Sequence, residues 1–271
     1  MLRIIIFDSG VGGLTIGQSL TEALPFAEQI LLADTAFFPY GEMEEDQLVK
    51  RVTSLLVSAV KRFEPDCIVV ACNTVSTVAL EKIRNSLLIP VIGVVPAIKP
   101  AALMSKSKVI GLLATPATVN RSYTADLVDS FAHDCELISV GSTRLVELSE
   151  QRLAGQKVDI EQLRQIVQPF LIAAREKQLD VIVLGCTHFP LLEDLLRDIL
   201  PNSILFIDSS KAIAKQVLKV LESSPPDKLQ SYQEHENKQV NRCFMTLVNE
   251  DEKFSAGLER YHFSSPEYYS L

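Results

Sequence analysis

Short apolar segments alternate with longer amphipathic ones along most of this chain, and this alternation limits the fold more than any other feature. The apolar segments are rich in Ile, Val and Leu with little polar alternation, which is typical of strands buried on both faces of a sheet. From these runs we expect strands at Arg3–Phe7, Gln29–Ala33, Cys67–Ala71, Val91–Val94, Val109–Ala114, Glu136–Val140, Val181–Gly185 and Leu205–Asp208.

The segments between these strands carry apolar residues at helical spacing. The clearest expected helices are Glu44–Phe63, Val75–Asn85, Val119–Phe131, Ile160–Gln178 and Leu191–Leu200. A strand followed by a helix, repeated along the chain, predicts a parallel sheet with helices on both faces. Because the strands are too many for one small sheet, we predict an α/β fold with two doubly wound parallel-sheet domains.

The pattern is interrupted at residues 95–100, where VPAIKP carries two prolines that should break any regular element. We therefore predict a discontinuous first domain, residues 1–95 and 206–271, and a second domain, residues 96–205. A helix at Asp208–Leu221 would return the chain to the first domain. The polar segment Ser223–Asn241 reads as a loop or mobile linker.

The end of the chain has weaker signals. Cys243–Val248 is expected to form an edge strand, and Lys253–Tyr261 a short helix.

Composition narrows the class of protein. The chain has 271 residues, is 47% hydrophobic and carries a formal net charge of −8. An acidic surface repels phosphate backbones, which argues against a nucleic-acid partner. No apolar run is long enough for a signal peptide or a membrane span, and five irregularly spaced cysteines indicate reduced thiols. We expect a cytoplasmic protein.

Two segments resemble each other and point to the site. IVVACNT ends in Cys72, Asn73 and Thr74, and IVLGCTH ends in Cys186, Thr187 and His188. Each is a buried-strand pattern that stops at a cysteine followed by small polar groups. Ligands of open α/β sheets bind beyond the carboxyl ends of the strands, so two facing domains could bring both thiols to one cleft.

The alternative is that these cysteines only fill the core, since free cysteine is among the most buried residue types. The matched contexts favour a functional role for Cys72 and Cys186. By contrast, Cys67, Cys135 and Cys243 lack such neighbours and read as packing or surface residues.

The first strand ends in FDSGVGGLT, whose glycines permit a tight turn that exposes backbone amides. A dinucleotide loop is one rival reading, with Asp34 as its ribose-binding acid, but Asp8 would repel a pyrophosphate. Asp8 and Ser9 suit the ammonium and carboxylate groups of a small zwitterion, although Asp8 could instead cap the first helix. Tyr40 and Gly41 lie in a turn that could present backbone amides and a phenol.

His188 follows Cys186 by two residues and could tune that thiol or relay its proton. Glu147, in LVELSE, could reach the same cleft or be a solvated helix residue.

The segments FDSGVGGLT, ADTAFFPYG, ACNTVST, LLATPAT and LGCTHFPLL occur in this order over roughly residues 4–209. Together they closely resemble the glutamate racemases of bacterial cell-wall synthesis, within the cofactor-independent aspartate/glutamate racemase family. The resemblance implies two domains related by pseudo-twofold symmetry, with glutamate between them. It also implies an isomerase that supplies D-glutamate for peptidoglycan, without cofactor or metal, and it allows a homodimer.

The resemblance assigns roles residue by residue. Cys72 and Cys186 would be the two catalytic acid/base groups, assisted by Asp8, His188 and Glu147. The implied substrate contacts are Asp8, Ser9, Tyr40, Gly41, Asn73, Thr74, Thr115, Thr118, Thr187 and His188. The chain departs from many relatives near the domain junction, where GVVPAIKPA replaces a Pro-Gly pair. Its first strand starts at once, so regulation through an N-terminal extension is not expected.

The chemistry agrees with this assignment. Inversion of an amino acid requires a base on one face of the α-carbon and an acid on the other, and a thiolate with a thiol can fill these roles. Three alternatives stay open: an aspartate racemase, a cysteine hydrolase with Cys186 as nucleophile and His188 as base, and a non-catalytic binding protein. A zinc site of Cys72, Cys186 and His188 would have only three ligands at a spacing that matches no zinc motif.

Overall fold

The structure is a computed structural model that describes residues 1–223, 241–248 and 250–271. The chain divides into two compact units, one of Met1–Val94 with Ser210–Leu271 and the other of Val95–Ser209. Residues 224–240 of the expected loop Ser223–Asn241 lie outside the described residues.

Unit 1 is built on a six-stranded sheet with the order β10-β9-β2-β1-β3-β4, in which every neighbouring pair is parallel. Its strands are β1 (Arg3–Asp8), β2 (Glu28–Ala33), β3 (Cys67–Val70), β4 (Val91–Gly93), β9 (Asn241–Met245) and β10 (Phe263–Tyr268). Its helices are α1 (Gly13–Ala23), η1 (Thr35–Phe37), η2 (Tyr40–Glu42), α2 (Glu45–Phe63), α3 (Asn73–Val78), α4 (Leu80–Ser86), α12 (Ser210–Glu222) and α14 (Glu252–Glu259).

Both faces of this sheet are buried, as its nearly unbroken apolar strands require. Ile5 and Phe7 of β1 belong to the core cluster that α2 closes. The next residue of the strand, Ile6, points to the opposite face, where α1 packs and α12 lies beside α1. Gly13 allows this close approach, because a Cβ there would lie 2.9 Å from the Ile6 side chain and 3.0 Å from that of Leu31.

Unit 2 is built on a four-stranded parallel sheet with the order β6-β5-β7-β8. Its strands are β5 (Val109–Ala114), β6 (Glu136–Gly141), β7 (Val181–Leu184) and β8 (Leu205–Ile207). Its helices are α5 (Ile98–Met104), α6 (Pro116–Val119), α7 (Ser122–Phe131), α8 (Arg144–Leu153), α9 (Ile160–Ile166), α10 (Gln168–Glu176), η3 (Phe189–Leu192) and α11 (Glu193–Ile199).

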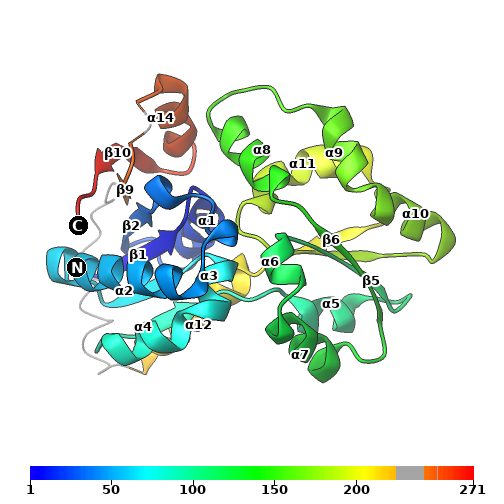
Figure 1. Ribbon diagram of the computed structural model, residues 1–271, viewed down its shortest axis with the longest axis horizontal. Helices are drawn as coiled ribbons and strands as arrows, with labels where there is room; N and C mark the ends of the chain where they lie inside the picture. The colour runs from blue at the N-terminus through cyan, green and yellow to red at the C-terminus, as the bar shows by residue number, and fades with distance from the viewer. Residues whose placement is uncertain (224–240, 249) are drawn as a thin grey trace. The chain divides into compact units, whose positions relative to one another are not determined.

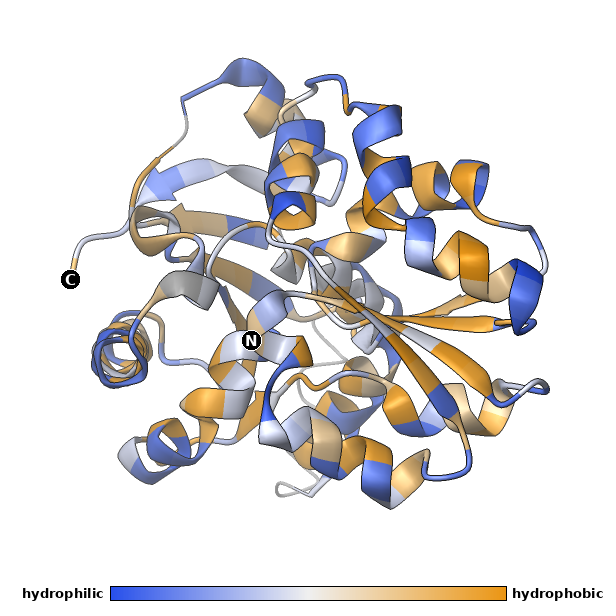
Figure 2. Cartoon of the chain, turned by 45° about the vertical axis from the view of Figure 1, so that its right-hand side comes forward, coloured by the Kyte–Doolittle hydropathy of each residue, from blue (hydrophilic) through white to orange (hydrophobic). Residues whose placement is uncertain are grey.

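Helices also cover both faces of this second sheet. In the view of Figure 1, α5 and α7 lie below β5 and β6, and α8, α9 and α11 lie above them. The side chains of α5 join β5 and β7 in one core cluster, and Phe170 of α10 packs near Gly111 on the other face. Figure 2 shows the strands of this sheet mainly hydrophobic, whereas the helices mix hydrophobic and hydrophilic residues. The predicted α/β class with two parallel sheets is therefore confirmed.

Several boundaries differ from the sequence predictions for physical reasons. The proline-rich segment 95–100 does not exclude a helix: α5 begins at Ile98, and Pro100 lies in its first turn, where no backbone N–H has an intrahelical partner. The expected helix Ile160–Gln178 is two helices that meet at Val167, because Pro169 opens the second. The strand Leu205–Ile207 pairs with β7 and belongs to unit 2. The chain therefore returns to unit 1 after Ser209, later than the predicted residue 206.

The C-terminal segment holds a strand that the sequence analysis missed. The segment expected as an edge strand forms β9, which lies between β2 and β10 and is therefore an interior strand. The edge is β10, which contains Pro266 and shifts register between Phe263 and Pro266. A proline and small polar residues hide this strand from an apolar pattern, and they suit an edge position.

Candidate active site

The two cysteines of the repeated motif occupy matched positions in the two sheets. Cys72 follows β3, and Cys186 follows β7. In each sheet the residue before the cysteine donates its backbone N–H to the neighbouring strand: Ala71 to Phe7 O and Gly185 to Leu113 O, both at 2.7 Å. Each thiol thus stands just beyond the carboxyl end of a parallel strand, where α/β folds place ligand sites.

Asp8 ends β1, the strand beside β3, and its carboxylate is fully buried. It accepts hydrogen bonds from Ser9, with the backbone N at 2.7 Å and the hydroxyl at 3.4 Å. The N-cap of α1 is Gly12, and no side chain caps that helix. The alternative in which Asp8 caps the first helix is therefore wrong, because α1 starts too far along the chain.

Cys72 is the N-cap residue of α3, so Asn73 and Thr74 form the first turn of that helix. All three side chains are buried, with exposed fractions of 5–7%. Helix α3 also packs against η2, which brings the Tyr40–Gly41 turn to the Cys72 side of unit 1.

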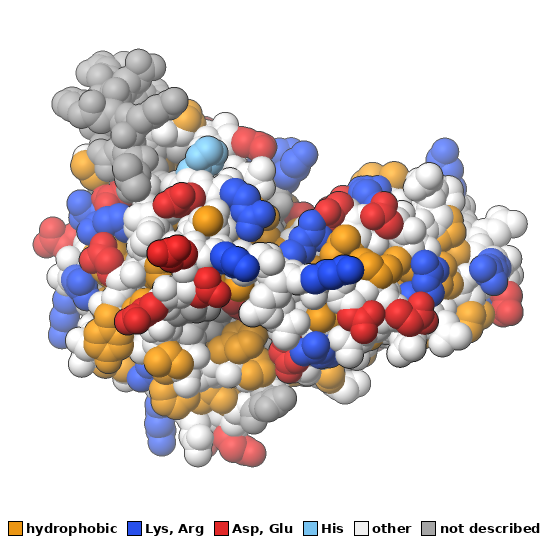
Figure 3. Space-filling view, turned by 90° about the horizontal axis from the view of Figure 1, so that it is seen from above, with side chains coloured by type: hydrophobic (Ala, Val, Ile, Leu, Met, Phe, Trp, Pro, Cys, Tyr) orange, Lys and Arg blue, Asp and Glu red, His pale blue; other side chains and the backbone are white. Residues whose placement is uncertain are grey.

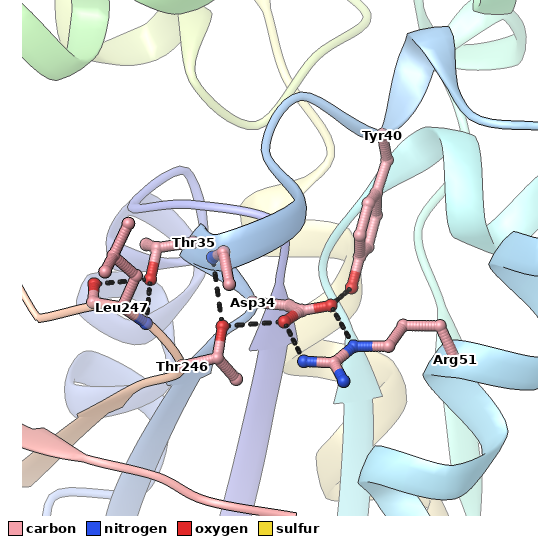
Figure 4. A network of polar contacts seen from close by, with 7 residues as sticks. Asp34, Thr35, Tyr40, Arg51, Thr246 and Leu247 are labelled. Atoms are coloured by element: carbon pink, nitrogen blue, oxygen red, sulfur yellow. Dashed lines mark hydrogen bonds and ion pairs between the residues drawn. The ribbon is translucent and has the colours of Figure 1, made fainter.

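The sequence analysis expected the Tyr40–Gly41 turn to be able to present a phenol, but the Tyr40 phenol is buried. Its hydroxyl donates to Asp34 Oδ2 at 2.6 Å, and the side chain is 2% exposed (Figure 4). Burial, followed by the charge of Asp34, raises the pKa of Tyr40 well above its usual value, so the phenol stays protonated. What this turn can offer a ligand is the backbone of Tyr40 and Gly41.

In unit 2, Cys186, His188 and Glu150 form a chain of polar contacts. The Cys186 sulfur lies 4.0 Å from His188 Nδ1, and His188 Nε2 lies 2.9 Å from Glu150 Oε1. In the tautomer of the neutral ring in which Nε2 carries the proton, Nε2 donates to the Glu150 carboxylate and Nδ1 is the acceptor on the side of the thiol.

The expectation for Glu147 is not supported. Its carboxylate forms an ion pair with Arg144 one turn earlier in α8, and its side chain is 45% exposed. The acid that reaches His188 is Glu150, which the sequence analysis missed although it stands in the same LVELSE motif. Both acids lie in α8, which packs against η3, and the sequence alone does not show which of them reaches His188.

The threonines of unit 2 are placed at strand ends and helix starts. Thr115 follows β5 and caps α6, with its hydroxyl accepting from Thr118 N at 3.3 Å. The Thr115 and Thr118 hydroxyls lie 3.1 Å apart. Thr187 is buried between Cys186 and His188.

The remaining cysteines lie where the sequence analysis put them. Cys67 and Cys243 are buried, and Cys135 is partly buried. Burial, with a smaller effect of Asp66, raises the pKa of Cys67 to about 12, which keeps it a thiol at neutral pH. Their interpretation as packing or surface residues is confirmed.

The dinucleotide interpretation loses its ribose-binding acid. Asp34, the candidate ribose-binding acid, is fully buried and paired with Arg51 at 2.8 Å, so its carboxylate is already used. Across residues 1–223, 241–248 and 250–271, no three His, Cys, Asp or Glu side chains gather as a metal site.

Comparison with known proteins decides the family. A model of the Asp/Glu/Hydantoin racemase family matches residues 15–217. A glutamate racemase from Vibrio vulnificus (strain YJ016) is 42% identical over 270 residues, 99% of this chain and 97% of the relative. The chain belongs to this racemase family. Racemases are isomerases, so the protein is identified as an enzyme of that class.

Two further matches extend the likeness of this racemase-family protein. A glutamate racemase from Aliivibrio fischeri (strain ATCC 700601 / ES114) is 50% identical over 219 residues, 81% of each chain. The crystal structure of Escherichia coli glutamate racemase, in complex with L-glutamate and the activator UDP-MurNAc-Ala, has a TM-score of 0.90 and 39% identity. That match covers 99% of this chain and 98% of the other.

The described surface carries charged side chains of both signs, as the 22% of charged residues in the sequence leads us to expect. Acidic and basic side chains lie interspersed on the face shown in Figure 3. Within the described residues, none of the helices has both the length and the apolar character needed to cross a bilayer.

Proposed function

We propose that this protein interconverts L- and D-glutamate, with Cys72 and Cys186 exchanging protons with opposite faces of the α-carbon. The observation that carries the proposal is the matched placement of the two thiols, each just beyond a parallel strand of its own unit. The Escherichia coli glutamate racemase, whose crystal structure is a complex with L-glutamate, is similar to this chain over 99% of its length. This similarity supports glutamate as the substrate.

The reaction itself requires two groups. One thiolate removes the α-proton, and a thiol on the other face returns a proton to the planar carbanion that results. A single residue would tend to return the proton to the face it came from. Two thiols at equivalent strand ends meet the requirement without a cofactor.

The two thiols must be unequally protonated, and Glu150 with His188 supplies a means in unit 2. Glu150 contacts one nitrogen of the His188 ring, and the other nitrogen, Nδ1, faces the Cys186 sulfur at 4.0 Å. The ring can therefore take the thiol proton when Cys186 acts as base, and the Glu150 charge stabilises the imidazolium that forms. Asp8 would help Cys72 in unit 1, since it ends the strand beside β3.

The substrate contacts remain those of the sequence analysis, with the Tyr40 assignment limited to its backbone. Backbone amides and hydroxyls would bind the glutamate carboxylates and stabilise the negative charge that develops on one of them. The proposed contacts are Asp8, Ser9, Tyr40, Gly41, Asn73, Thr74, Thr115, Thr118, Thr187 and His188. D-glutamate made in this way would serve peptidoglycan synthesis in the cytoplasm, where catalytic thiols stay reduced.

The test is an isotope experiment in deuterated water without added cofactor. We expect L-glutamate and D-glutamate each to gain an α-deuterium and to converge on the same racemic mixture. Aspartate serves as the matched substrate control, because it is one methylene shorter, and we expect much slower exchange with it. If aspartate were turned over as fast as glutamate, glutamate would not be the specific substrate. If neither amino acid gained an α-deuterium, the proposal would be overturned.

One observation favours a second candidate function. Cys186, His188 and Glu150 have the order of a nucleophile, a base and an acid that orients the base, as in cysteine hydrolases. A hydrolase would leave the matched position of Cys72 unexplained. It would also leave the α-proton of glutamate unexchanged, so the same isotope experiment separates the two functions.

A further inference from the structure

The Asp34 carboxylate lies at the centre of a buried network that the proposed reaction does not use directly. Asp34 follows β2, and its backbone N donates to the Asp8 carbonyl at 2.9 Å. Its side chain is fully buried, whereas that of Arg51 is 21% exposed. Four hydrogen bonds reach this one carboxylate, from η2, α2 and the segment after β9 (Figure 4).

Arg51 of α2 neutralises the buried charge. Its Nη2 donates to Asp34 Oδ1 at 2.8 Å and its Nε to Oδ2 at 3.0 Å, the two-point geometry in which a guanidinium fits a carboxylate. The same guanidinium lies 4.3 Å from the centre of the Phe37 ring. Arg51 therefore contacts both the start and the middle of the segment that leads to Tyr40.

Thr246 comes from the segment after β9 and ties the network to the C-terminal part of unit 1. Its hydroxyl donates to Asp34 Oδ1 at 2.7 Å and accepts from Ala36 N at 3.0 Å. The next residue, Leu247, exchanges two hydrogen bonds with the Thr35 hydroxyl, at 2.9 and 2.7 Å. Because the family model matches only residues 15–217, this anchor lies outside the matched region.

The network ends on Tyr40, whose hydroxyl completes the set on Asp34 at 2.6 Å. Tyr40 and Cys72 share one core cluster, so the Tyr40–Gly41 turn is fixed to the Cys72 side of unit 1. A turn offers backbone amides to a ligand only when its conformation is held in advance.

We propose that Arg51 and Thr246 are positioning residues for glutamate: they hold the Asp34 carboxylate, which holds the Tyr40–Gly41 turn ready to receive the substrate. This inference rests on the proposed function. It assigns a role in substrate binding to the C-terminal segment, and it makes the Tyr40 phenol a structural group and not a substrate contact.

The test compares hydroxyl removal at two buried sites of unit 1. Thr246→Val deletes the anchoring hydroxyl, and Thr246→Ser keeps it. Tyr269→Phe removes a hydroxyl that bonds Ser58 Oγ at 2.9 Å and does not contact Asp34. For Thr246→Val we expect KM for both enantiomers to rise about 5- to 10-fold, the effect of one lost buried hydrogen bond, with a smaller change in kcat. Thr246→Ser should restore the wild-type KM, and Tyr269→Phe should leave it unchanged.

Arg51→Lys keeps the positive charge but loses the two-point contact with Asp34. If Thr246→Val does not fold, KM is measured for Arg51→Lys instead, and we expect it to rise. Amide hydrogen exchange of peptides covering residues 34–43 adds a readout without substrate, and it should quicken in Thr246→Val but not in Tyr269→Phe. An unchanged KM in a folded Thr246→Val enzyme would overturn the positioning role alone. A wild-type protein that neither binds nor racemises glutamate would overturn the proposed function, and the positioning role with it.

Discussion

His188 connects the thiol and the carboxylate of unit 2, with Cys186 on one ring nitrogen and Glu150 on the other. The His188 side chain is 2% exposed, so these contacts lie inside the protein. Two acids of helix α8, one turn apart, differ in their contacts. Glu150 orients the histidine, whereas Glu147 pairs with Arg144 at the surface.

Replacement of each acid by its amide tests this claim. Glu150→Gln keeps an acceptor for His188 Nε2 but removes the charge that stabilises the imidazolium, so we expect kcat/KM to fall by about 10-fold or more. Glu147→Gln is the matched control, and it should stay within about twofold of wild type because exposed ion pairs contribute little. Steady-state racemisation measures both, and equal losses in the two variants would argue against the Glu150 assignment.

These residues also show which parts of the candidate site could be predicted from the sequence. The strand-end cysteines were predicted as a pair because strand pattern and small polar neighbours repeat. The choice between Glu147 and Glu150 was not accessible, since both lie in one motif and helix rotation depends on tertiary packing. The buried position of the Tyr40 phenol was not predicted, because its partner Asp34 is held by Arg51 and Thr246, and neither of these residues belongs to a motif.

At the scale of elements, the two sheets share one plan. The order β2-β1-β3-β4 in unit 1 corresponds to β6-β5-β7-β8 in unit 2, and β9 and β10 extend the first sheet only. The correspondence reaches single hydrogen bonds: Asp34 N donates to Asp8 O and Ser142 N to Ala114 O, both at 2.9 Å. The sequence predicted the buried strands well, because apolar runs mark them, and it missed the polar edge strand β10.

Asp180 joins two elements of unit 2 and gives a prediction about stability. It precedes β7, and its carboxylate accepts from Ser105 Oγ at 2.6 Å and from the backbone N of Lys106 and Ser107 at 2.7 and 3.0 Å. Burial alone would raise its pKa, but these hydrogen bonds outweigh burial and lower it. We expect Asp180→Ala to lower the free energy of unfolding by about 1.5–3 kcal/mol at neutral pH.

The pH dependence of this difference has a defined sign. A carboxyl group whose pKa is lowered by folding stabilises the protein above its unfolded pKa of about 3.9, and this contribution is lost as the pH falls through the folded value. Urea unfolding of wild type and Asp180→Ala at neutral and acidic pH measures it. The gap between the two proteins should narrow in acid, and a gap that widens there would contradict the role of the charged form.

At the scale of the whole molecule, each compact unit holds one strand-end cysteine and an acidic residue that we propose assists it. Cys72 has Asp8 at the neighbouring strand end, and Cys186 has His188 with Glu150. The sequence indicated two domains because the strands were too many for one sheet and the chain crossed twice. The pseudo-twofold relation, the homodimer and the meeting of the two thiols at one substrate stay predictions.

The most direct measurement of that meeting uses Cys72→Ser and Cys186→Ser in deuterated water, with each glutamate enantiomer supplied separately. The proposal requires both variants to lose racemisation by about 10²-fold or more, because each lacks the acid or base of one face. The remaining thiol should still exchange the α-proton of one enantiomer with retention of configuration, and the two variants should prefer opposite enantiomers. Near-wild-type racemisation by either variant, or the same preferred enantiomer in both, would contradict the two-thiol mechanism.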